Sequence, residues 1–414
     1  MTETQRLIGP PLGELNQMTD LSAVPQSLSP LLTSIRRHLH KNPEIGLAEF
    51  ETSRFIREVL EMHGLNVQGP FAETGLWVDI DGEHPGPMVA FRADIDALPI
   101  QDTKDVPYAS TNSGLGHLCG HDAHTTIAIG VALLLSGLRH LIHGSVRVFF
   151  QPNEEGIPSG APLMIEEGVL EGVEAVFACH VDPTLPVGQF GLAAGPITAS
   201  ADRFRIRVMA PTTGHSARPH QSVDTIWIAT QIMADLYQLI RRVTDARNSA
   251  VLAICRVHAG EAYNVLPAIA ELGGTVRCTE NDDRKHIREQ IVRTATELGK
   301  MHDAQTKVDF DNGAPPVIND KDLAKLVEEA ILETHGPEAI FEIPRPSMGA
   351  EDFAHYLTHV PGLLLRVGTS TGPDTSHPLH DSDFDVDESS LSIASQLMSR
   401  VLIKFLQQPT NGSV

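Results

Sequence analysis

Hydrophobic residues recur along this chain with two different periods, and the two periods alternate between residues 31 and 196. Some segments carry a stripe at helical spacing, as in Leu31, Leu32, Ile35 and Leu39. Others are short apolar runs of strand length, bounded by Gly, Pro or Asp. The predicted helices cover 31–40, 50–63 and 125–140, and the predicted strands cover 76–80, 88–93, 145–151 and 175–179. This alternation predicts a mostly parallel sheet that is covered by helices on both faces.

The pattern changes near Pro196. Phe204, Ile206 and Val208 alternate with arginines, which predicts a half-exposed strand. From there the elements follow the order strand, helix, strand, strand, helix, strand, which is the ferredoxin-like arrangement. Their predicted ranges are 203–208, 223–242, 250–258, 268–278, 283–300 and 306–310. A helix over 321–335, an apolar run over 363–367 and a helix over 388–406 then resume the first pattern.

The simplest domain plan is an α/β catalytic domain interrupted by a smaller, ferredoxin-like α+β domain. We expect residues 29–196 and 313–414 to form the first domain and residues 197–312 to form the second. Residues 1–28 carry three prolines and little periodicity, so we expect a partly ordered N-terminal arm.

The composition restricts the partners of this chain. Its 53 acidic and 31 basic side chains give a net charge of −22. Nucleic acids and anionic membrane surfaces both favour positive charge, so neither is expected as a partner. An anionic small-molecule substrate would need a local positive group to offset the overall field.

The four cysteines are Cys119, Cys179, Cys255 and Cys278. They are too few and too scattered for a disulfide framework in a chain of this size, which favours a reducing compartment. No basic region followed by an apolar stretch is visible near residue 1, and the longest apolar run, 127–135, is far shorter than the ~20 residues that span a bilayer. We therefore expect a cytoplasmic protein.

Side chains that bind transition metals occur next to apolar runs at four places. They are Cys119 with His121, Glu154 with Glu155, His180, and His380. Two of these places follow a predicted strand directly, and in open α/β sheets the ligand crevice lies at the carboxyl ends of the strands. A mixed set of sulfur, nitrogen and oxygen donors is what a transition-metal site requires. The first hypothesis is therefore a metallohydrolase.

The adjacent carboxylates Glu154 and Glu155 suggest a division of labour. Neighbours on extended backbone point in opposite directions, so one can bind metal while the other acts as general base toward the substrate. Taken alone, the pair also suits a solvated turn, and each histidine suits an ordinary core or loop position. His377 competes with His380 as a ligand, and Asp122 is a candidate for orienting a ligand imidazole.

Several sequence words together are similar to those of the M20 metallopeptidase superfamily, in particular its amidohydrolase branch of aminoacylases, hippurate hydrolases and indole-3-acetyl-amino-acid hydrolases. The resemblance covers nearly all of the chain from residue 31 onward. The words are RRHLHKNPEIGLAEFETS at 36–53, FRADIDALPI at 91–100, CGHDAHTT at 119–126, QPNEEG at 151–156, GHSARPH at 214–220, YNVLP at 263–267, GTVR at 274–277, GAEDF at 349–353 and LHDSDF at 379–384.

The resemblance implies a site for two divalent metal ions, zinc or manganese, and a general base at Glu154. The implied metal ligands are Cys119, His121, Glu155, His180 and His380. The inserted domain resembles the family's lid, which also forms the homodimer contact. His215 is expected to stabilise an oxyanion, and Asn264 matches a lid asparagine. Arg277 matches a lid arginine and is a candidate for binding a substrate carboxylate, although it also suits an ordinary exposed strand position.

The chain departs from the wider superfamily at Asp94-Ile95-Asp96, where many members have His-x-Asp. The amidohydrolase branch shares this change, which leaves the role of Asp94 open. The role of Glu351 is open as well. The resemblance implies hydrolysis of N-acyl amino acids to a carboxylic acid and a free amino acid. A dipeptidase or carboxypeptidase, a cysteine hydrolase using Cys119, and a non-catalytic binding protein remain alternatives.

Overall fold

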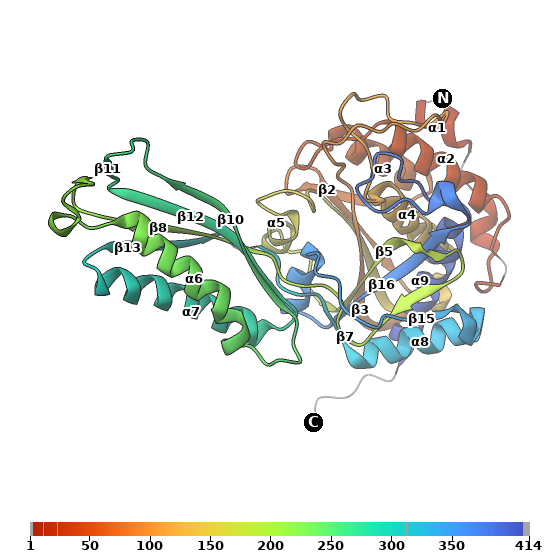
Figure 1. Cartoon of the computed structure of the whole chain (residues 1–414). Helices are drawn as coiled ribbons and strands as arrows, with labels where there is room; N and C mark the ends of the chain where they lie inside the picture. The colour runs from red at the N-terminus through yellow and green to blue at the C-terminus, as the bar shows by residue number, and fades with distance from the viewer. Residues whose placement is uncertain (1–2, 11, 23, 312, 409–414) are drawn as a thin grey trace. The chain divides into compact units, whose positions relative to one another are not determined.

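The computed structural model describes residues 3–10, 12–22, 24–311 and 313–408. The chain divides into two compact units (Figure 1). The first contains Met1–Gly195, Ile318–Pro344 and His355–Val414, and the second contains Pro196–Val317 and Arg345–Ala354. Parts of the expected arm (1–2, 11 and 23), residue 312 at an expected domain boundary, and residues 409–414 lie outside the described residues.

The domain boundaries differ from the sequence plan at residue 196 and at residues 313–317, which belong to the second unit, and more markedly at a segment further along the chain. Residues 345–354 belong to the second unit, although we had placed 313–414 entirely in the first. Backbone hydrogen bonds explain the difference. The Ser347 N–H donates to the Ile197 carbonyl oxygen at 2.9 Å, and the Ala199 N–H donates to the Gly349 carbonyl oxygen at 3.0 Å. Pairing between residues so distant in sequence leaves no periodic signal in either segment.

The first unit is built on an eight-stranded sheet in the order β1-β2-β4-β3-β5-β16-β6-β15. Its strands are β1 Val67–Phe71, β2 Gly75–Asp81, β3 His84–Asp94, β4 His143–Gln151, β5 Val173–Pro186, β6 Phe190–Leu192, β15 Ile340–Glu342 and β16 Gly362–Ser370. The four central strands β4, β3, β5 and β16 are parallel neighbours, whereas β1, β2 and β6 bring antiparallel pairings toward the edges. The mostly parallel sheet predicted from the sequence is confirmed.

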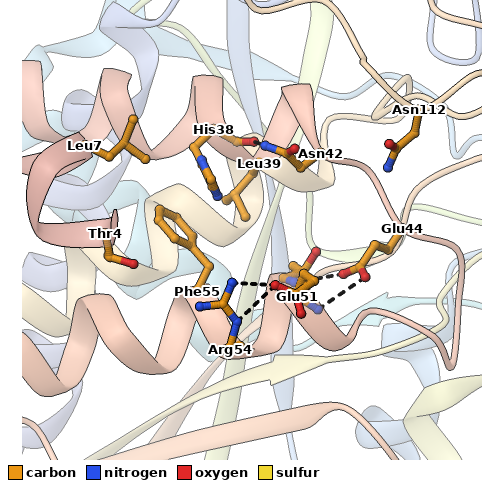
Figure 2. A pocket seen from close by; sticks show the side chains of 11 residues that line it. Thr4, Leu7, His38, Leu39, Asn42, Glu44, Glu51, Arg54, Phe55 and Asn112 are labelled. Carbon is orange, nitrogen blue, oxygen red and sulfur yellow. Dashed lines mark hydrogen bonds and ion pairs between the residues drawn. The ribbon is translucent and has the colours of Figure 1, made fainter. Parts of the chain in front are cut away.

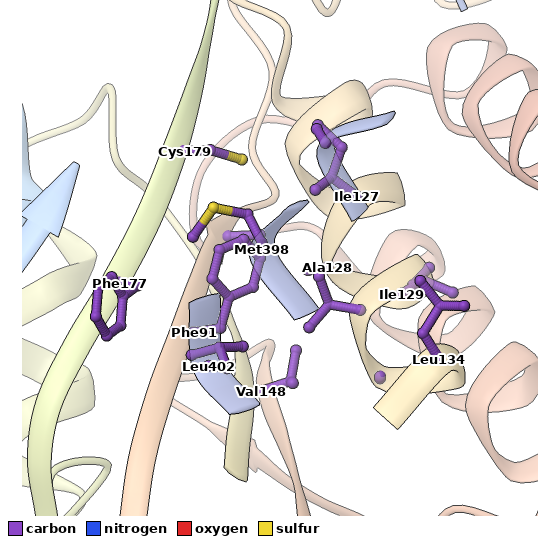
Figure 3. Packing of buried hydrophobic residues seen from close by; sticks show 14 of the residues in the cluster. Phe91, Ile127, Ala128, Ile129, Leu134, Val148, Phe177, Cys179, Met398 and Leu402 are labelled. Atoms are coloured by element: carbon purple, nitrogen blue, oxygen red, sulfur yellow. The ribbon is translucent and has the colours of Figure 1, made fainter. Parts of the chain in front are cut away.

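Helices of the first unit flank this sheet. They are α1 Glu3–Ile8, α2 Leu28–Lys41, α3 Phe50–Met62, α4 His121–Gly137, α5 Gly160–Glu166, α8 Lys321–His335 and α9 Ser389–Leu406. In Figure 3, Phe91, Val148 and Phe177 from the strands lie close to side chains of α4 and α9. Residues 121–135 of α4 are all buried, and from Ile127 to Leu135 the helix is apolar all round rather than striped. A Cβ on Gly130 would come within 2.3 Å of Ser395 Oγ, so glycine permits the close approach of α4 and α9.

The second unit is a four-stranded antiparallel sheet in the order β10-β12-β8-β13. Its elements are β8 Asp202–Met209, α6 Thr225–Val243, β10 Ala250–Ala259, β12 Ile269–Cys278, α7 Asn281–Met301 and β13 Gln305–Asp311. Both helices pack on the sheet and share its hydrophobic core. This order is that of a ferredoxin-like fold, as predicted. A small pair, β9 Gly214–His215 with β11 Val265–Leu266, completes the unit, and the two-residue strands β7 Gly195–Pro196 and β14 Ile318–Asn319 lie where the chain passes between units.

Most predicted elements begin and end within three residues of those observed, but β5 extends seven residues beyond the predicted end at residue 179, and β3 begins four residues before the predicted start at residue 88. We expected the helix of residues 125–140 to begin four residues later than it does, because α4 begins at His121. Among the described residues, none of the helices is both long and apolar enough to cross a membrane.

Candidate active site

The carboxyl ends of three parallel neighbours bring the candidate residues to one edge of the sheet. β3 ends at Asp94, β4 ends at Gln151 just before the glutamate pair, and β5 carries His180. Because β4, β3 and β5 are adjacent and parallel, residues far apart in sequence meet there. Asp94, Gln151 and His180 are all buried, so their polar atoms require partners inside the protein.

The start of α4 provides two more donors. Gly120 is the residue before the helix, with φ of 85°, a left-handed conformation that glycine adopts at little cost. A Cβ at Gly120 would lie 2.3 Å from Cγ2 of Val181 in β5. Glycine therefore allows Cys119 and His121 to flank the turn while the helix terminus lies directly against the sheet.

The predicted donor atoms come together in overlapping groups, each with its atoms within 4.8 Å of one another. Cys119, His121 and His180 form one group, and Cys119 also groups with Glu155 and His380. A further group joins His121 to Glu154 and Glu155. All six residues belong to the first unit. The structure thus gathers the sulfur, imidazole and carboxylate donors that were selected from the sequence.

The imidazole hydrogen bonds fit a metal-binding arrangement. His121 Nδ1 lies 2.9 Å from the carbonyl oxygen of Asp96 and 3.1 Å from its Oδ1, so Nδ1 carries the proton. Its Nε2 is buried and has no hydrogen-bond partner among the described residues. His180 Nδ1 donates to the Val181 carbonyl oxygen at 2.8 Å, and its Nε2 lies 3.7 Å from Cys119 Sγ. Each imidazole is therefore fixed through Nδ1 and offers Nε2, the geometry typical of a metal ligand.

The pKa values of His121 and His180 are shifted in opposite directions. Burial alone would lower the pKa of His121, but the neighbouring Asp94 and Asp96 raise it well above 6.5. Burial lowers the pKa of His180 well below 6.5, and the neighbouring His124 and Arg366 lower it further. The buried carboxylates around His121 favour a positive charge on this imidazole. A divalent cation bound at its Nε2 would compete with the proton for that position.

Cys119 does not resemble an activated nucleophile. Burial raises the pKa of its thiol well above 9, and the nearby charges of Glu155 and Glu154 also raise it. Reactive cysteines have lowered pKa values in electropositive surroundings. A bound cation, by contrast, would favour the thiolate form. These features disfavour a cysteine hydrolase and fit a metal ligand.

His380 completes the cluster from a loop rather than from a strand. Its Nε2 lies 3.2 Å from Glu155 Oε1, and its backbone N–H donates to the Leu118 carbonyl oxygen at 2.7 Å. Its φ of 69° is uncommon for a residue other than glycine, and such strained backbone often occurs at functional sites. His377, the competing residue, lies instead 3.8 Å from Asp381.

The expectation for Asp122 was wrong. Its carboxylate does not orient a ligand imidazole but accepts hydrogen bonds at Oδ2 from Arg36 Nε at 2.8 Å and from His40 Nδ1 at 2.7 Å. Asp96 does the orienting, since Oδ1 lies against His121 and Oδ2 accepts the Glu155 N–H at 3.0 Å. Side chains of the first helical turn point in different directions, and the sequence did not reveal which one faces the cluster.

Asp94 organises the layer beneath the donors. Its Oδ2 forms an ion pair with Arg92 at 2.7 Å, and its Oδ1 accepts from His124 Nδ1 at 2.7 Å. His124 Nε2 in turn accepts the Val181 N–H at 2.9 Å. Both nitrogens of His124 are therefore engaged, which excludes it as a ligand in this arrangement. Burial alone would raise the pKa of Asp94, but His121 and Arg92 hold it well below its usual range.

The loop before the glutamate pair is held by a buried carboxyl group. Glu49 Oε1 accepts the Asn153 N–H at 2.9 Å, and Glu49 Oε2 accepts the Thr74 hydroxyl at 2.6 Å. Asn153 has φ of 52°, so the chain bends sharply just before Glu154. Burial raises the pKa of Glu49 from 4.5 to about 7, against the opposing effect of the Thr74 hydrogen bond.

Replacing Glu49 with glutamine should remove a pH-dependent loss of stability. A carboxyl group whose pKa is higher in the folded protein than in the unfolded chain costs folding free energy as it ionises. Its contribution is therefore most favourable below about pH 4.5 and declines as the pH rises through about 7. Relative to wild type, the free energy of unfolding of the variant should rise by up to roughly 3 kcal/mol as the pH increases from 5 to 8. Urea unfolding of both proteins at the two pH values measures this, and a difference that does not change with pH would contradict it.

The three remaining predicted residues belong to the second unit. His215 is exposed in β9, where it pairs with Val265, and its Nδ1 accepts the Ala217 N–H at 3.1 Å. Asn264 is exposed, and its carbonyl oxygen accepts the Ser216 N–H at 3.1 Å. Arg277 lies in β12 and donates from Nη1 to the Met348 carbonyl oxygen at 2.8 Å. The first two are thus neighbours at the small β9–β11 pair, whereas Arg277 is already engaged in part.

Sequence reasoning did not assign roles to Asp96, Glu49 or Arg36. A signal existed for Asp96, because it lies just beyond the carboxyl end of a buried strand, like the donors that were chosen. For Glu49 and Arg36 the sequence offers only a charged residue near an amphipathic helix, which ordinarily predicts exposure. Both are in fact fully buried.

A separate cavity of about 380 Å³ lies between α1, α2 and the start of α3 (Figure 2). Its lining includes His38, Glu44, Arg54 and Phe55. Glu44 there accepts the backbone N–H groups of Glu51 and Thr52 at 3.2 and 2.8 Å. None of the clustered metal-type donors lines this cavity, so it is distinct from the candidate site.

Several known proteins are similar to this chain in sequence and in structure. The sequence profile described as peptidase family M20/M25/M40 matches residues 90–404. An N-acetyl-L-cysteine deacetylase of Bacillus subtilis is 36% identical over 377 residues, which cover 90% of this chain and 88% of that protein. The IAA-amino acid hydrolase ILR1-like 2 of Arabidopsis thaliana is 34% identical over 388 residues, covering 92% and 87%. The crystal structure of the Bacillus subtilis YXEP protein, described as a dinuclear metal binding peptidase from the M20 family, is similar with a TM-score of 0.82 and 35% identity, covering 93% of this chain and 100% of that one.

Proposed function

Because this chain belongs to the peptidase family M20/M25/M40, we propose that it hydrolyses the amide bond of N-acyl amino acids, releasing a carboxylic acid and a free amino acid. The chain is a metal-dependent hydrolase of the amidohydrolase branch. The observation that carries the proposal is the buried His121 Nε2, which has no hydrogen-bond partner among the described residues and lies in the cluster that includes the glutamate pair. The names of the two curated relatives, a deacetylase of an acetylated amino acid and a hydrolase of IAA-amino acids, support this substrate class.

The donor set fits two divalent cations, which we propose to be zinc or manganese. The residues that would hold them are Cys119, His121, Glu155, His180 and His380. Thiolate, imidazole and carboxylate together suit a borderline metal such as zinc, and the carboxylate and imidazole donors also suit manganese. When bound, the cations supply Lewis-acid polarisation of the amide carbonyl and acidify a water molecule.

Glu154 carries the proton in this mechanism. Its carboxylate lies in the same group as His121 and Glu155, so it borders the place where the reacting carbonyl and water would meet. Glu154 takes the proton of the attacking water, and then delivers it to the nitrogen of the leaving amino acid. Asp96 holds His121 and the Glu155 backbone in place during both steps.

We propose that the second unit acts as a lid and contributes His215 to stabilise the developing oxyanion, with Asn264 and Arg277 as substrate contacts. The unit is also the proposed homodimer contact. One of its two edge strands, β10, exposes Val251 and Val257, and an edge that has no strand partner among the described residues can pair with a second copy. Sedimentation velocity should report a dimer, and replacing Val257 with lysine should yield monomers. A monomer in the unaltered protein would contradict this contact.

A substrate panel tests the proposed function. Acetyl-, benzoyl- and long-chain acyl amino acids are compared with dipeptides, each with added zinc, manganese or cobalt and after chelation. We expect turnover of acyl amino acids that disappears with chelator and returns with metal. Preference for dipeptides would instead favour the peptidase alternative, which is suggested by the description of the YXEP structure. Chelator-resistant turnover with covalent trapping at Cys119 would indicate a cysteine hydrolase, and a metal-free, inactive protein would indicate a binding role.

We also propose that the protein resides in the cytoplasm. Cys119, Cys179, Cys255 and Cys278 are all free of disulfides, which suits the reducing cytoplasm.

A further inference from the structure

Arg366 lies next to the donor cluster on a neighbouring strand. It is part of β16, which runs parallel to β5, and its register partner is His180. Partners on adjacent strands point their side chains to the same face of the sheet, about 5 Å apart at the backbone. Both residues belong to the first unit. The guanidinium therefore projects on the face from which His180 contributes its imidazole.

The surroundings of Arg366 leave its side chain room. On its other side β16 pairs with β6, and the partner of Arg366 there is Gly191. A Cβ on Gly191 would lie only 2.9 Å from the Cβ of Arg366, so a larger residue would compete for the same space. From Gly362 to Thr369 every residue except Arg366 is buried. The arginine is thus a partly exposed cation on an otherwise enclosed strand.

The charge of Arg366 has no ion-pair partner in the part of the chain that the structure describes. Among the described residues, its guanidinium makes neither an ion pair nor a hydrogen bond, whereas Arg92 on the same sheet is paired with Asp94 at 2.7 Å. A partly buried guanidinium beside a reaction site suits an anionic partner that arrives from solution.

We propose that Arg366 binds the free α-carboxylate of the substrate. The inference rests on the proposed function and names the group that recognises the amino acid half. In an N-acyl amino acid only the amide nitrogen and Cα separate the scissile carbonyl from the carboxylate, so a cation near the donor cluster is required. The net charge of −22 repels such an anion, which makes a local guanidinium more important. Arg277, the arginine selected from the sequence, already donates to the Met348 carbonyl oxygen.

The test compares one substrate with and without its carboxylate. The best N-acetyl amino acid of the panel and its C-terminal primary amide are assayed with the metal-loaded wild type and with Arg366→Gln. We expect the KM for the acid to rise about 10- to 100-fold with kcat nearly unchanged, and kcat/KM for the amide to change less than about twofold. Arg366→Lys should restore part of the discrimination, because lysine keeps the charge but not the bidentate geometry.

Matched variants exclude general effects. Arg400→Gln changes a partly exposed arginine of α9 and should leave the acid-to-amide ratio unchanged, with metal content equal in all variants. Equal losses on acid and amide in Arg366→Gln would overturn the proposal. So would loss of discrimination in Arg277→Gln with Arg366→Gln unaffected. If the panel shows a dipeptidase, the same comparison with a dipeptide and its amide tests Arg366 although the proposed function has failed. A protein that hydrolyses neither class would overturn both proposals.

Discussion

Replacing Glu154 with glutamine is expected to lower kcat by about a hundredfold to ten-thousandfold while leaving metal content nearly intact. Glutamine has the same shape but neither accepts nor returns a proton at neutral pH. Glu154 contributes an oxygen to the group with His121 and Glu155, and from this position the proposed general base would act on the water and on the leaving amine. Steady-state kinetics and metal analysis by plasma emission spectroscopy measure the two quantities on the same preparation.

Glu155→Gln is the matched control. It changes the adjacent carboxylate, which lies 3.2 Å from His380 and within the group that includes Cys119. This variant should lose metal as well as activity, because it removes a charged donor. If Glu154→Gln loses metal to the same degree, or keeps normal turnover, the division of roles between the two glutamates is wrong.

Replacing Arg36 with methionine is expected to destabilise the protein by about 3–5 kcal/mol. The Arg36 side chain is fully buried and bonds to Asp122 at 2.8 Å and to Asp385 at 2.6 Å. Burial alone would raise the pKa of Asp122, but Arg36 and His40 hold it well below its usual range. Without the guanidinium, two buried carboxylates would lose their main counter-charge. Urea unfolding at pH 7 with saturating metal measures the loss.

The next residue offers a control of the same type. Arg37 forms an ion pair with Glu388 at 2.7 Å, but its side chain is 47% exposed. Solvent screening limits such pairs to about 1 kcal/mol or less, so Arg37→Met should have little effect. Similar losses in the two variants would mean that the buried network has no special role. A large loss confined to Arg36→Met would link α2 to the start of α4, which carries His121.

The periodic parts of the fold were predictable because burial repeats along them. The stripe of α2 and the apolar run of β4 required no knowledge of the rest of the protein. The short strands β6 and β15, each three residues long, were not predicted, because their pairing partners are distant and their sequences carry no alternation. The placement of residues 345–354 failed for the same reason.

The donor set was predictable to a similar extent. Strand ends place residues at one edge of a parallel sheet, and this rule together with the family resemblance selected Cys119, His121, Glu155 and His180. The rule says nothing of the helix that follows, where Asp122 was chosen for its place beside His121 in the sequence, although Asp96 orients that imidazole. The rule also does not predict buried polar residues that hold a loop in place, such as Glu49, which accepts a hydrogen bond from the loop before the glutamate pair.

The two oxygens of Asp96 have different partners, one at a side chain and one at a main-chain amide. A displacement of this carboxylate would therefore be felt at His121 and Glu155 together, on segments that are otherwise separate in the chain. Exchanging one of the proposed ligands, His121 or Glu155, to change the metal preference would also disturb the other, because Asp96 contacts both. A redesign of the site would therefore need to change Asp96, His121 and Glu155 together.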